Sequence, residues 1–326
     1  MRGAKPFEEL EHGLAEALAA TPPGGVALAC SGGPDSVALT AAAAATARVS
    51  GLPLVVLHVN HALRAAAERD EGVALGVASR LGLPFQSTVL QGPAGDEATL
   101  RAGRYDALAT MALARGCTAI ATAHTLEDQV ETVLLALVRG TGLRGLAGMP
   151  QQRPMGSGLV LLRPLLGRGH GELRAYCHAH GLPYALDETN ADARYRRNRL
   201  RVLLQHLREV EPSADQAIAR LAHLAREEDA YLDERAAEAL SLSAAEEGGL
   251  DERIGELPRP LLRRVLRLWL GGRDLAFEHL DRLAEAAAQG RRGRFFVRKG
   301  EEVVIGAGML ERRVTTDGED SEPDRN

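Results

Sequence analysis

The segment Ser31–Ser36, which reads SGGPDS, contains the residue types of an anion-binding loop. The apolar run Val26–Cys30 precedes it and predicts a buried strand, and a helix-favouring run follows from Ser36. The two glycines let the backbone turn tightly and approach a ligand, while the serines add hydroxyl donors. The free amides of such a strand-to-helix turn point at one spot, which favours a phosphate group.

Asp35 is the unusual residue of this loop, because its carboxylate would repel a bare phosphate. A Mg²⁺ ion between the carboxylate and the phosphate removes that conflict, so we interpret Asp35 as a metal ligand. A tight turn before a capped helix is the ordinary alternative. The loop lacks the Gly-Lys-Ser/Thr of a Walker loop and does not match Gly-x-Gly-x-x-Gly. It resembles the pyrophosphate loop of the ATP pyrophosphatases, which implies that ATP contacts Ser31, Gly32, Gly33, Pro34, Asp35 and Ser36.

Two carboxylates follow another predicted strand, at 118–122. Asp128 and Glu131 are three residues apart and therefore share one helix face. Paired carboxylates close to a phosphate site need cations, which Mg²⁺ or an amino-group substrate would supply. Thr125 and Asp128 are also spaced as a capping box, and that structural role is compatible with the chemical one.

Three basic residues are candidates to contact a ligand bound at the edge of the predicted sheet. His61 and Arg64 follow the strand predicted at 54–59, and a loop before a capped helix is their ordinary alternative. Arg104 lies on the helix before the strand at 118–122. We interpret it as a group that steadies pyrophosphate or a substrate carboxylate, whereas an exposed surface arginine is the default.

The positive charge of the chain is concentrated in one stretch, although the formal net charge is −5. Between Arg139 and Arg208 there are twelve arginines against four acidic residues, which leaves a local charge of +8. A general preference for arginine explains the scarcity of lysine but not the scarcity of acids. The stretch therefore predicts a polyanionic partner. Within it, Arg194–Arg201 holds five arginines beside Tyr195, which suits phosphate contacts and base stacking.

Strand-like and helix-like runs alternate along the first part of the chain. Strands are predicted at 26–30, 54–59, 85–90, 118–122 and 159–162, with helices between most of them. Gly82, Gly116 and Gly140 stand where C-cap glycines end those helices. The alternation predicts an α/β fold with a doubly wound parallel sheet, whose ligands lie at the carboxyl ends of the strands.

Two domains are expected from the length of 326 residues. We place a catalytic, ATP-binding domain at 1–212 and a smaller, mainly helical domain at 213–314 that binds tRNA or substrate. The polar and acidic segment 315–326 is predicted to be a disordered tail. Helices are expected at about 213–240, 260–270 and 275–289, and a basic hairpin at 291–310.

Composition excludes several classes of protein. No apolar run approaches the roughly 20 residues that span a membrane, and the N-terminus does not have the pattern of a signal peptide. The three cysteines are scattered and form no Cys-x-x-Cys, which suggests a reducing compartment and argues against a zinc site. We therefore expect a cytoplasmic protein without membrane contact, and leave a homodimer open.

The order of motifs resembles the tRNA(Ile)-lysidine synthase family over about residues 24–210. The motifs are SGGPDS, HVNHALR, AHTLEDQVET, RGTGLRGLAGM, RPLL and DETNADARYRRNRLR. The resemblance implies a Rossmann-like fold of the adenine nucleotide alpha hydrolase type. It differs at Thr125 and Glu127, where the family often has histidine and aspartate, so no role is carried over to those two positions.

The resemblance also implies a reaction. ATP adenylates the 2-carbonyl oxygen of the wobble cytidine of a tRNA(Ile) with a CAU anticodon and releases pyrophosphate, and the ε-amine of L-lysine then displaces AMP. It makes the protein a carbon–nitrogen ligase in which Asp35, Arg104, Asp128 and Glu131 are catalytic and Asp35 holds Mg²⁺. Substrate contacts are assigned to His61, Arg64, Asp128, Glu131, Arg139, Arg144, Arg196, Arg197, Arg199 and Arg201. The alternatives are a tRNA 2-thiolation enzyme, an amidating synthetase with the same loop, and a non-catalytic nucleotide- or RNA-binding module.

Overall fold

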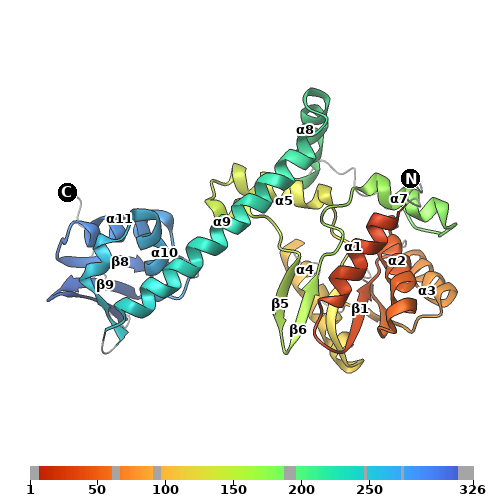
Figure 1. Cartoon of the computed structure of the whole chain (residues 1–326), viewed down its shortest axis with the longest axis horizontal. Coiled ribbons are helices and arrows are strands. Elements are labelled where there is room, and N and C mark those ends of the chain that lie inside the picture. The colour runs from red at the N-terminus through yellow and green to blue at the C-terminus, as the bar shows by residue number, and fades with distance from the viewer. Residues whose placement is uncertain are drawn as a thin grey trace. The chain divides into compact units, whose positions relative to one another are not determined.

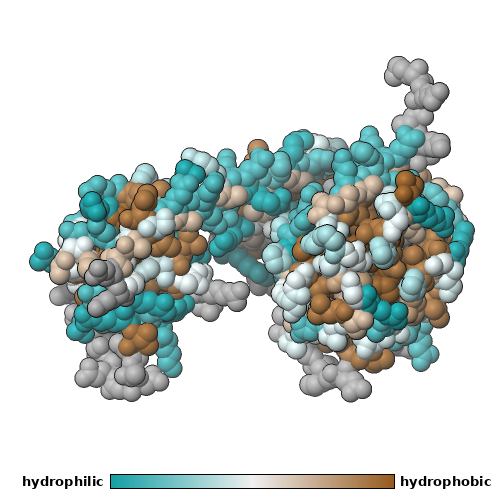
Figure 2. All heavy atoms as spheres, turned by 60° about the horizontal axis from the view of Figure 1, so that its bottom comes forward, coloured by the Kyte–Doolittle hydropathy of each residue, from teal (hydrophilic) through white to brown (hydrophobic). Residues whose placement is uncertain are grey.

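The structure is a computed structural model that describes residues 7–60, 67–90, 97–186, 196–245, 248–272 and 275–314. It divides into two compact units, 1–224 and 225–326. The expected domain boundary after residue 212 falls in the turn between α8 (Arg196–Val210) and α9 (Ala214–Ser243). The division between the two units, after residue 224, lies within α9. The visible face of α9 is mostly hydrophilic in Figure 2, as its many acidic residues and arginines require.

The first unit is built on a six-stranded sheet with the order β3-β2-β1-β4-β6-β5. The pairs among β3, β2, β1, β4 and β6 are parallel, and β5 is an antiparallel edge strand. The α/β fold with a parallel, doubly wound sheet is therefore confirmed, and β5 is an addition that was not expected. The strands are β1 (Gly25–Ala29), β2 (Leu54–Asn60), β3 (Phe85–Val89), β4 (Cys117–Ala121), β5 (Gln152–Gly156) and β6 (Leu159–Leu162).

Helices cover both faces of this sheet (Figure 1). Alternate strand residues such as Val26 and Leu28 pack with α1, α2, α3 and α7 in one apolar cluster, while Ala27 and Ile120 pack with α4 in another. C-cap glycines end α3, α4 and α5 with positive φ, as predicted. The remaining elements of the unit are α1 (Glu8–Ala19), α2 (Pro34–Ser50), α3 (Ala67–Leu81), α4 (Glu97–Ala114), α5 (Leu126–Val138), α6 (Leu143–Leu146) and α7 (His170–Ala179).

The strand order creates a switch point between β1 and β4. From β1 the chain moves outward through β2 to β3, and it then returns to the other side of β1 to form β4. The loops that leave the carboxyl ends of β1 and β4 therefore run in opposite directions. The crevice between them is the usual ligand site of open α/β sheets.

The second unit contains a four-stranded antiparallel sheet with the order β7-β10-β9-β8 and the helices α10 and α11. The expected hairpin corresponds to β8 and β9, while β10 and β7 extend it into a sheet that the sequence did not indicate. Its core is a separate apolar cluster. The elements are β7 (Leu250–Asp251), the 3₁₀ helix η3 (Glu252–Glu256), α10 (Arg259–Trp269), α11 (Phe277–Ala288), β8 (Gly293–Arg298), β9 (Glu301–Gly306) and β10 (Met309–Val314). Within the described ranges, every helix is too short or too polar to cross a bilayer.

Candidate active site

The loop between β1 and α2 is held in shape by its own serines. The Ser36 hydroxyl accepts a hydrogen bond from the backbone N–H of Ser31 at 3.1 Å and donates one to the Gly33 carbonyl at 2.9 Å. Gly33 is the N-cap of α2 and Pro34 occupies its first turn, where the missing N–H costs nothing. The helix N-terminus is thus oriented toward the switch point without a side-chain cap, and its amides remain available to an anion.

Gly32 is required at its position for two reasons. Its φ is +88°, and a Cβ built there would lie 2.6 Å from the carbonyl oxygen of Asp70 in α3. A side chain would therefore be strained and would also collide with backbone atoms. The Gly32 carbonyl accepts a hydrogen bond from the Ala185 N–H at 2.9 Å, so a second segment buttresses the loop.

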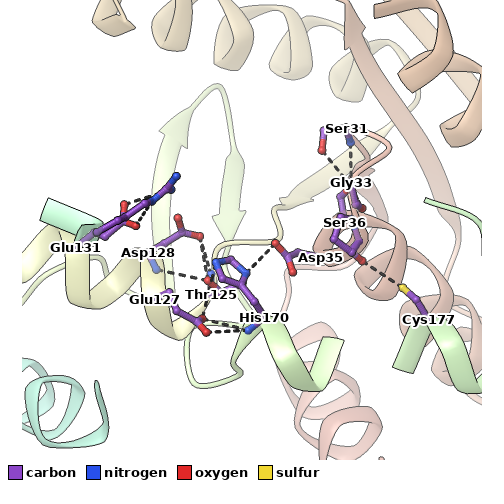
Figure 3. Close-up of polar contacts among 12 residues, drawn as sticks. Ser31, Gly33, Asp35, Ser36, Thr125, Glu127, Asp128, Glu131, His170 and Cys177 are labelled. Atoms are coloured by element: carbon purple, nitrogen blue, oxygen red, sulfur yellow. Dashed lines mark hydrogen bonds and ion pairs between the residues drawn. The ribbon is translucent and has the colours of Figure 1, made fainter. Parts of the chain in front are cut away.

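Asp35 leaves the first turn of α2 and faces His170, the first residue of α7 (Figure 3). Its Oδ2 lies 3.0 Å from Nδ1 of His170. Its Oδ1 is buried and has no hydrogen-bond partner among the described residues. One oxygen of this carboxylate is therefore paired inside the protein, and the other is an acceptor whose partner is missing, a costly state for a buried charge.

His170 joins the two sides of the switch point. Glu127, at the start of α5, accepts the backbone N–H of His170 at 3.0 Å and so caps α7. Burial opposes a positive charge on His170, but the hydrogen bond and charge of Asp35 outweigh it and raise the pKa of His170. The carboxylates of Glu127 and Asp128 act in the same direction. His170 was not predicted as a site residue, because a single histidine within Gly169-His170-Gly171 carries no recognisable signal.

Asp128 forms the predicted capping box. Its Oδ2 accepts the Thr125 backbone N–H at 2.9 Å, and the Thr125 hydroxyl is the acceptor for the Asp128 N–H at 3.4 Å. Both capping bonds to the Asp128 carboxylate use Oδ2, and Oδ1 takes part in neither. Helix capping and ligand binding are therefore compatible at this residue.

Glu131 lies on the same face of α5 and is nearly buried, with a side chain that is 6% exposed. Its Oε1 accepts a hydrogen bond from Nε of Arg201 at 2.5 Å, and Oε2 lies 3.5 Å from a terminal nitrogen of that guanidinium. Leu200 and Leu204 of α8 pack with Val130 in a small apolar cluster that fixes the register of the two helices. The structure thus joins two predicted site residues in an ion pair that the sequence did not indicate.

The glycine-rich segment 140–149 is fastened to α5 by Gln129. The amide of Gln129 donates to the Met149 carbonyl at 3.1 Å, and its oxygen accepts the Met149 N–H at 2.8 Å. Although the segment is rich in glycine, it contains the short helix α6. The reason is that glycines at its ends permit the turns while Leu143–Leu146 closes one helical turn.

The other predicted site residues occupy varied positions. Arg104, on α4, is exposed and is one of the charged groups near His124. Arg139, Arg144 and Arg199 are also exposed. Four further predictions lie outside the residues, or the side chains, that the structure describes: His61, Arg64, Arg196 and Arg197.

All three cysteines are buried and unpaired. Burial raises the pKa of the Cys177 thiol to about 11, so this sulfur is a thiol at neutral pH. Cys177 donates to the Pro34 carbonyl at 3.3 Å and so contributes to packing beneath the phosphate-binding loop. The described part of the chain contains no group of three or more His, Cys, Asp or Glu side chains arranged to hold a metal ion.

Comparison with known proteins identifies the family to which this chain belongs. The family model of the PP-loop domain matches residues 6–207. The tRNA(Ile)-lysidine synthase of Gloeobacter violaceus is 39% identical over 277 residues, which are 83% of this chain and 85% of that protein. That of Salinispora arenicola is 41% identical over 89% of this chain and 90% of the relative. The chain belongs to the tRNA(Ile)-lysidine synthase family. Some members extend further, because the match covers only 58% of the Ralstonia nicotianae protein at 40% identity.

Among solved structures, the U34-tRNA thiolase NcsA from Methanococcus maripaludis has the same fold. The two superpose with a TM-score of 0.58 at 16% identity, over 68% of this chain and 80% of that one. At this identity the likeness concerns the fold alone. It confirms the expected Rossmann-like architecture for a member of the tRNA(Ile)-lysidine synthase family, while membership itself rests on the sequence relatives.

Proposed function

We propose that this protein, acting in the cytoplasm, uses ATP to join L-lysine to C2 of the wobble cytidine in tRNA(Ile) with the CAU anticodon. The products are lysidine, AMP and pyrophosphate. Family membership supports the ligase reaction and the tRNA. The observation that carries the proposal is the meeting, across one switch point, of a phosphate-binding loop with carboxylates suited to an amine.

ATP binding falls to the loop Ser31–Ser36 in this proposal. The uncapped N-terminus of α2 offers its amides to the phosphates, and Gly32 allows the backbone to approach them closely. The unpartnered Oδ1 of Asp35 fits a Mg²⁺ ion, which takes one or two carboxylates and completes its shell with water and phosphate oxygens. When bound, that ion would neutralise charge on the leaving pyrophosphate.

Carboxylates of α5 bind the amino groups of lysine in this proposal. Free lysine has a side-chain pKa of ~10.4, so its ε-ammonium must lose a proton before the nitrogen attacks C2 of the cytidine. Asp128 and Glu131 are the carboxylates that would hold the amino groups, and a carboxylate that contacts the ε-amine is also placed to accept the proton. The attack forms the carbon–nitrogen bond, and the carbon–oxygen bond to AMP breaks.

The decisive experiment supplies ATP, radiolabelled lysine and a tRNA(Ile) transcript with a CAU anticodon. We expect label to enter the RNA, with one AMP and one pyrophosphate formed for each lysine joined. A transcript with a changed wobble base is the control and should stay unlabelled. Release of pyrophosphate without label in the RNA would favour another PP-loop tRNA-modifying enzyme, and binding without pyrophosphate release would favour a non-catalytic module.

Arg199 gives a separate prediction about the RNA. It is exposed on α8 and forms no ion pair with a described residue. If it contacts a phosphate, Arg199→Ala should flatten the dependence of log K for tRNA on log salt by about 0.7 to 0.9, because one set of counterions is no longer released. Filter binding of the transcript at several salt concentrations measures this slope.

Arg208 is the matched control for that prediction, since it lies on the same helix. Its guanidinium is held by Asp215, with contacts of 2.9 to 3.2 Å. Arg208→Ala should therefore leave the salt slope close to that of the unmodified protein. Equal flattening by both variants would mean that only the net charge of α8 matters and that Arg199 makes no specific contact.

A further inference from the structure

Three arginines gather at the carboxyl edge of the sheet, on the side that faces α4. Strand alternation places them there: Arg163 continues the face of Leu159 and Leu161, and Arg153 on β5 lies opposite Leu161. Arg101 is on α4, one turn before Tyr105. We call Arg101, Arg153 and Arg163 the arginine cluster.

Tyr105 is the centre around which the arginine cluster is arranged. Arg101 donates to the Tyr105 hydroxyl at 3.2 Å, and its guanidinium carbon lies 5.3 Å from the ring centre. The guanidinium carbon of Arg153 lies 5.5 Å from the same centre. Cation–π contacts of this kind offset only part of the repulsion between two cations that share one ring.

The described structure supplies no acidic partner to the arginine cluster. None of the three forms an ion pair with a described carboxylate, whereas Arg168, Arg208 and Arg264 each do. Arg163 is only 4% exposed, and its Nε is buried without a hydrogen-bond partner. Buried cations without a counter-ion are costly, so the arrangement fits a site that is completed by an anion.

His124 contacts the arginine cluster through Arg101 and also lies within range of the charge of Asp128. Arg101 has only donors, so Nε2 of His124, 3.4 Å away, is an acceptor and Nδ1 carries the proton. That proton is donated to the Thr122 hydroxyl at 2.9 Å, and Thr122 in turn donates to the Leu162 carbonyl. Burial lowers the pKa of His124 to about 4, so the ring is neutral at pH 7 and does not neutralise either group.

The neutral His124 ring thus links the two kinds of charge, because it contacts Arg101 and directly precedes Thr125, whose backbone N–H is bound by Asp128. Asp128 and Arg101 are both close enough to His124 to act on its charge. An amino acid carries the complementary pair, an ammonium and a carboxylate on one small molecule. The burial of Arg163 and the half-buried state of Arg101 and Arg153 favour a small anion over an extended phosphate backbone.

We propose that the arginine cluster binds the α-carboxylate of the lysine substrate. Arg101 and Arg153 contact the carboxylate, and Arg163, pinned by its hydrogen bond to the Pro150 carbonyl at 2.8 Å, acts as a positioning residue behind them. This inference rests on the proposed function. It adds a selection for free amino acids over diamines and amides of similar size, because only a free carboxylate satisfies the cluster.

The test compares lysine with lysinamide, which keeps both amines and lacks the carboxylate, in the ligation assay. In Arg101→Gln and Arg153→Gln we expect the KM for lysine to rise about tenfold or more, as for a lost hydrogen bond to a charged group. The KM for lysinamide should change little, so the preference for lysine over lysinamide shrinks. Arg115→Gln is the matched control, because Arg115 follows α4 and its guanidinium donates to the side chain of Gln86, away from the cluster. This variant should leave both KM values unchanged.

Other outcomes overturn the inference separately from the proposed function. If the unmodified protein joins no lysine, the proposed function fails first. If it does, but the two variants weaken lysine and lysinamide equally, the cluster does not bind the carboxylate. A raised KM for ATP would assign the cluster to phosphates of the nucleotide, and a flatter salt slope for tRNA would assign it to the RNA. Melting temperatures close to that of the unmodified protein verify that both variants are folded.

Discussion

Asp35→Asn should reduce the rate of pyrophosphate release about a hundredfold or more, while the protein still folds. The amide has nearly the same shape and can still face His170, but it lacks the charge that holds a divalent cation at the phosphates. Removing one group that stabilises transition-state charge commonly costs a factor of this size. Pyrophosphate release in the presence of the tRNA measures the effect, and titration with Mg²⁺ should not restore it.

Glu127→Gln is the matched control for Asp35→Asn. Glu127 is the other carboxylate beside His170, and its nearer contact is with the backbone N–H that starts α7. A glutamine oxygen can still accept that bond, so this variant should retain most of the activity. If both variants lost activity to the same extent, the negative charge around His170 would be the requirement, and a metal role specific to Asp35 would be wrong.

Glu131→Gln should raise the KM for lysine by about tenfold to a hundredfold, since hydrogen bonds to charged groups contribute roughly 1.5 to 3 kcal/mol. The KM for ATP should change much less, because the phosphate-binding loop lies between β1 and α2, whereas Glu131 is on α5. Ligation at varied lysine and at varied ATP gives the two constants. Equal increases in both would indicate a structural or metal-binding role.

Arg201→Ala separates lysine binding from stability, because it breaks the same ion pair from the other side. Both variants should lose some thermal stability, and the side chain of Arg201 is 37% exposed, so solvent limits that loss. If Glu131 holds the substrate, Arg201→Ala should leave the KM for lysine unchanged or lower it. A KM raised by both variants would show that the intact pair matters, and not the carboxylate alone.

The sequence predicted the features that local chemistry determines. The loop Ser31–Ser36 has a recognisable order of residue types, and Thr125 with Asp128 has the spacing of a capping box, so both were found without the fold. The strands that lie in the middle of the sheet are apolar runs bounded by glycine or proline. Strand β5 was missed because its sequence, QRPMG, contains proline and lacks alternation, which an edge strand tolerates.

Contacts between distant parts of the chain could not be predicted from residue types and spacing. Asp35 meets His170, and Glu131 meets Arg201, only because the strand order and the packing of α8 on α5 bring them together. No spacing in the sequence encodes either pair. The arginine cluster had a weak signal, because Arg163 continues the alternation of the strand before it, but its partners Arg101 and Arg153 come from separate elements.

The ion pair between Glu131 and Arg201 makes the amine site an exchange site, in which one cation must leave before another enters. Lysine would then bind only to molecules in which Arg201 has released the carboxylate. Its apparent affinity would equal the intrinsic affinity multiplied by the fraction of such molecules. Arg201 lies on the helix that carries the basic stretch expected to meet RNA. Any phosphate that draws its guanidinium away would tighten lysine binding without touching lysine. By reciprocity, bound lysine would strengthen the hold on the RNA to the same degree.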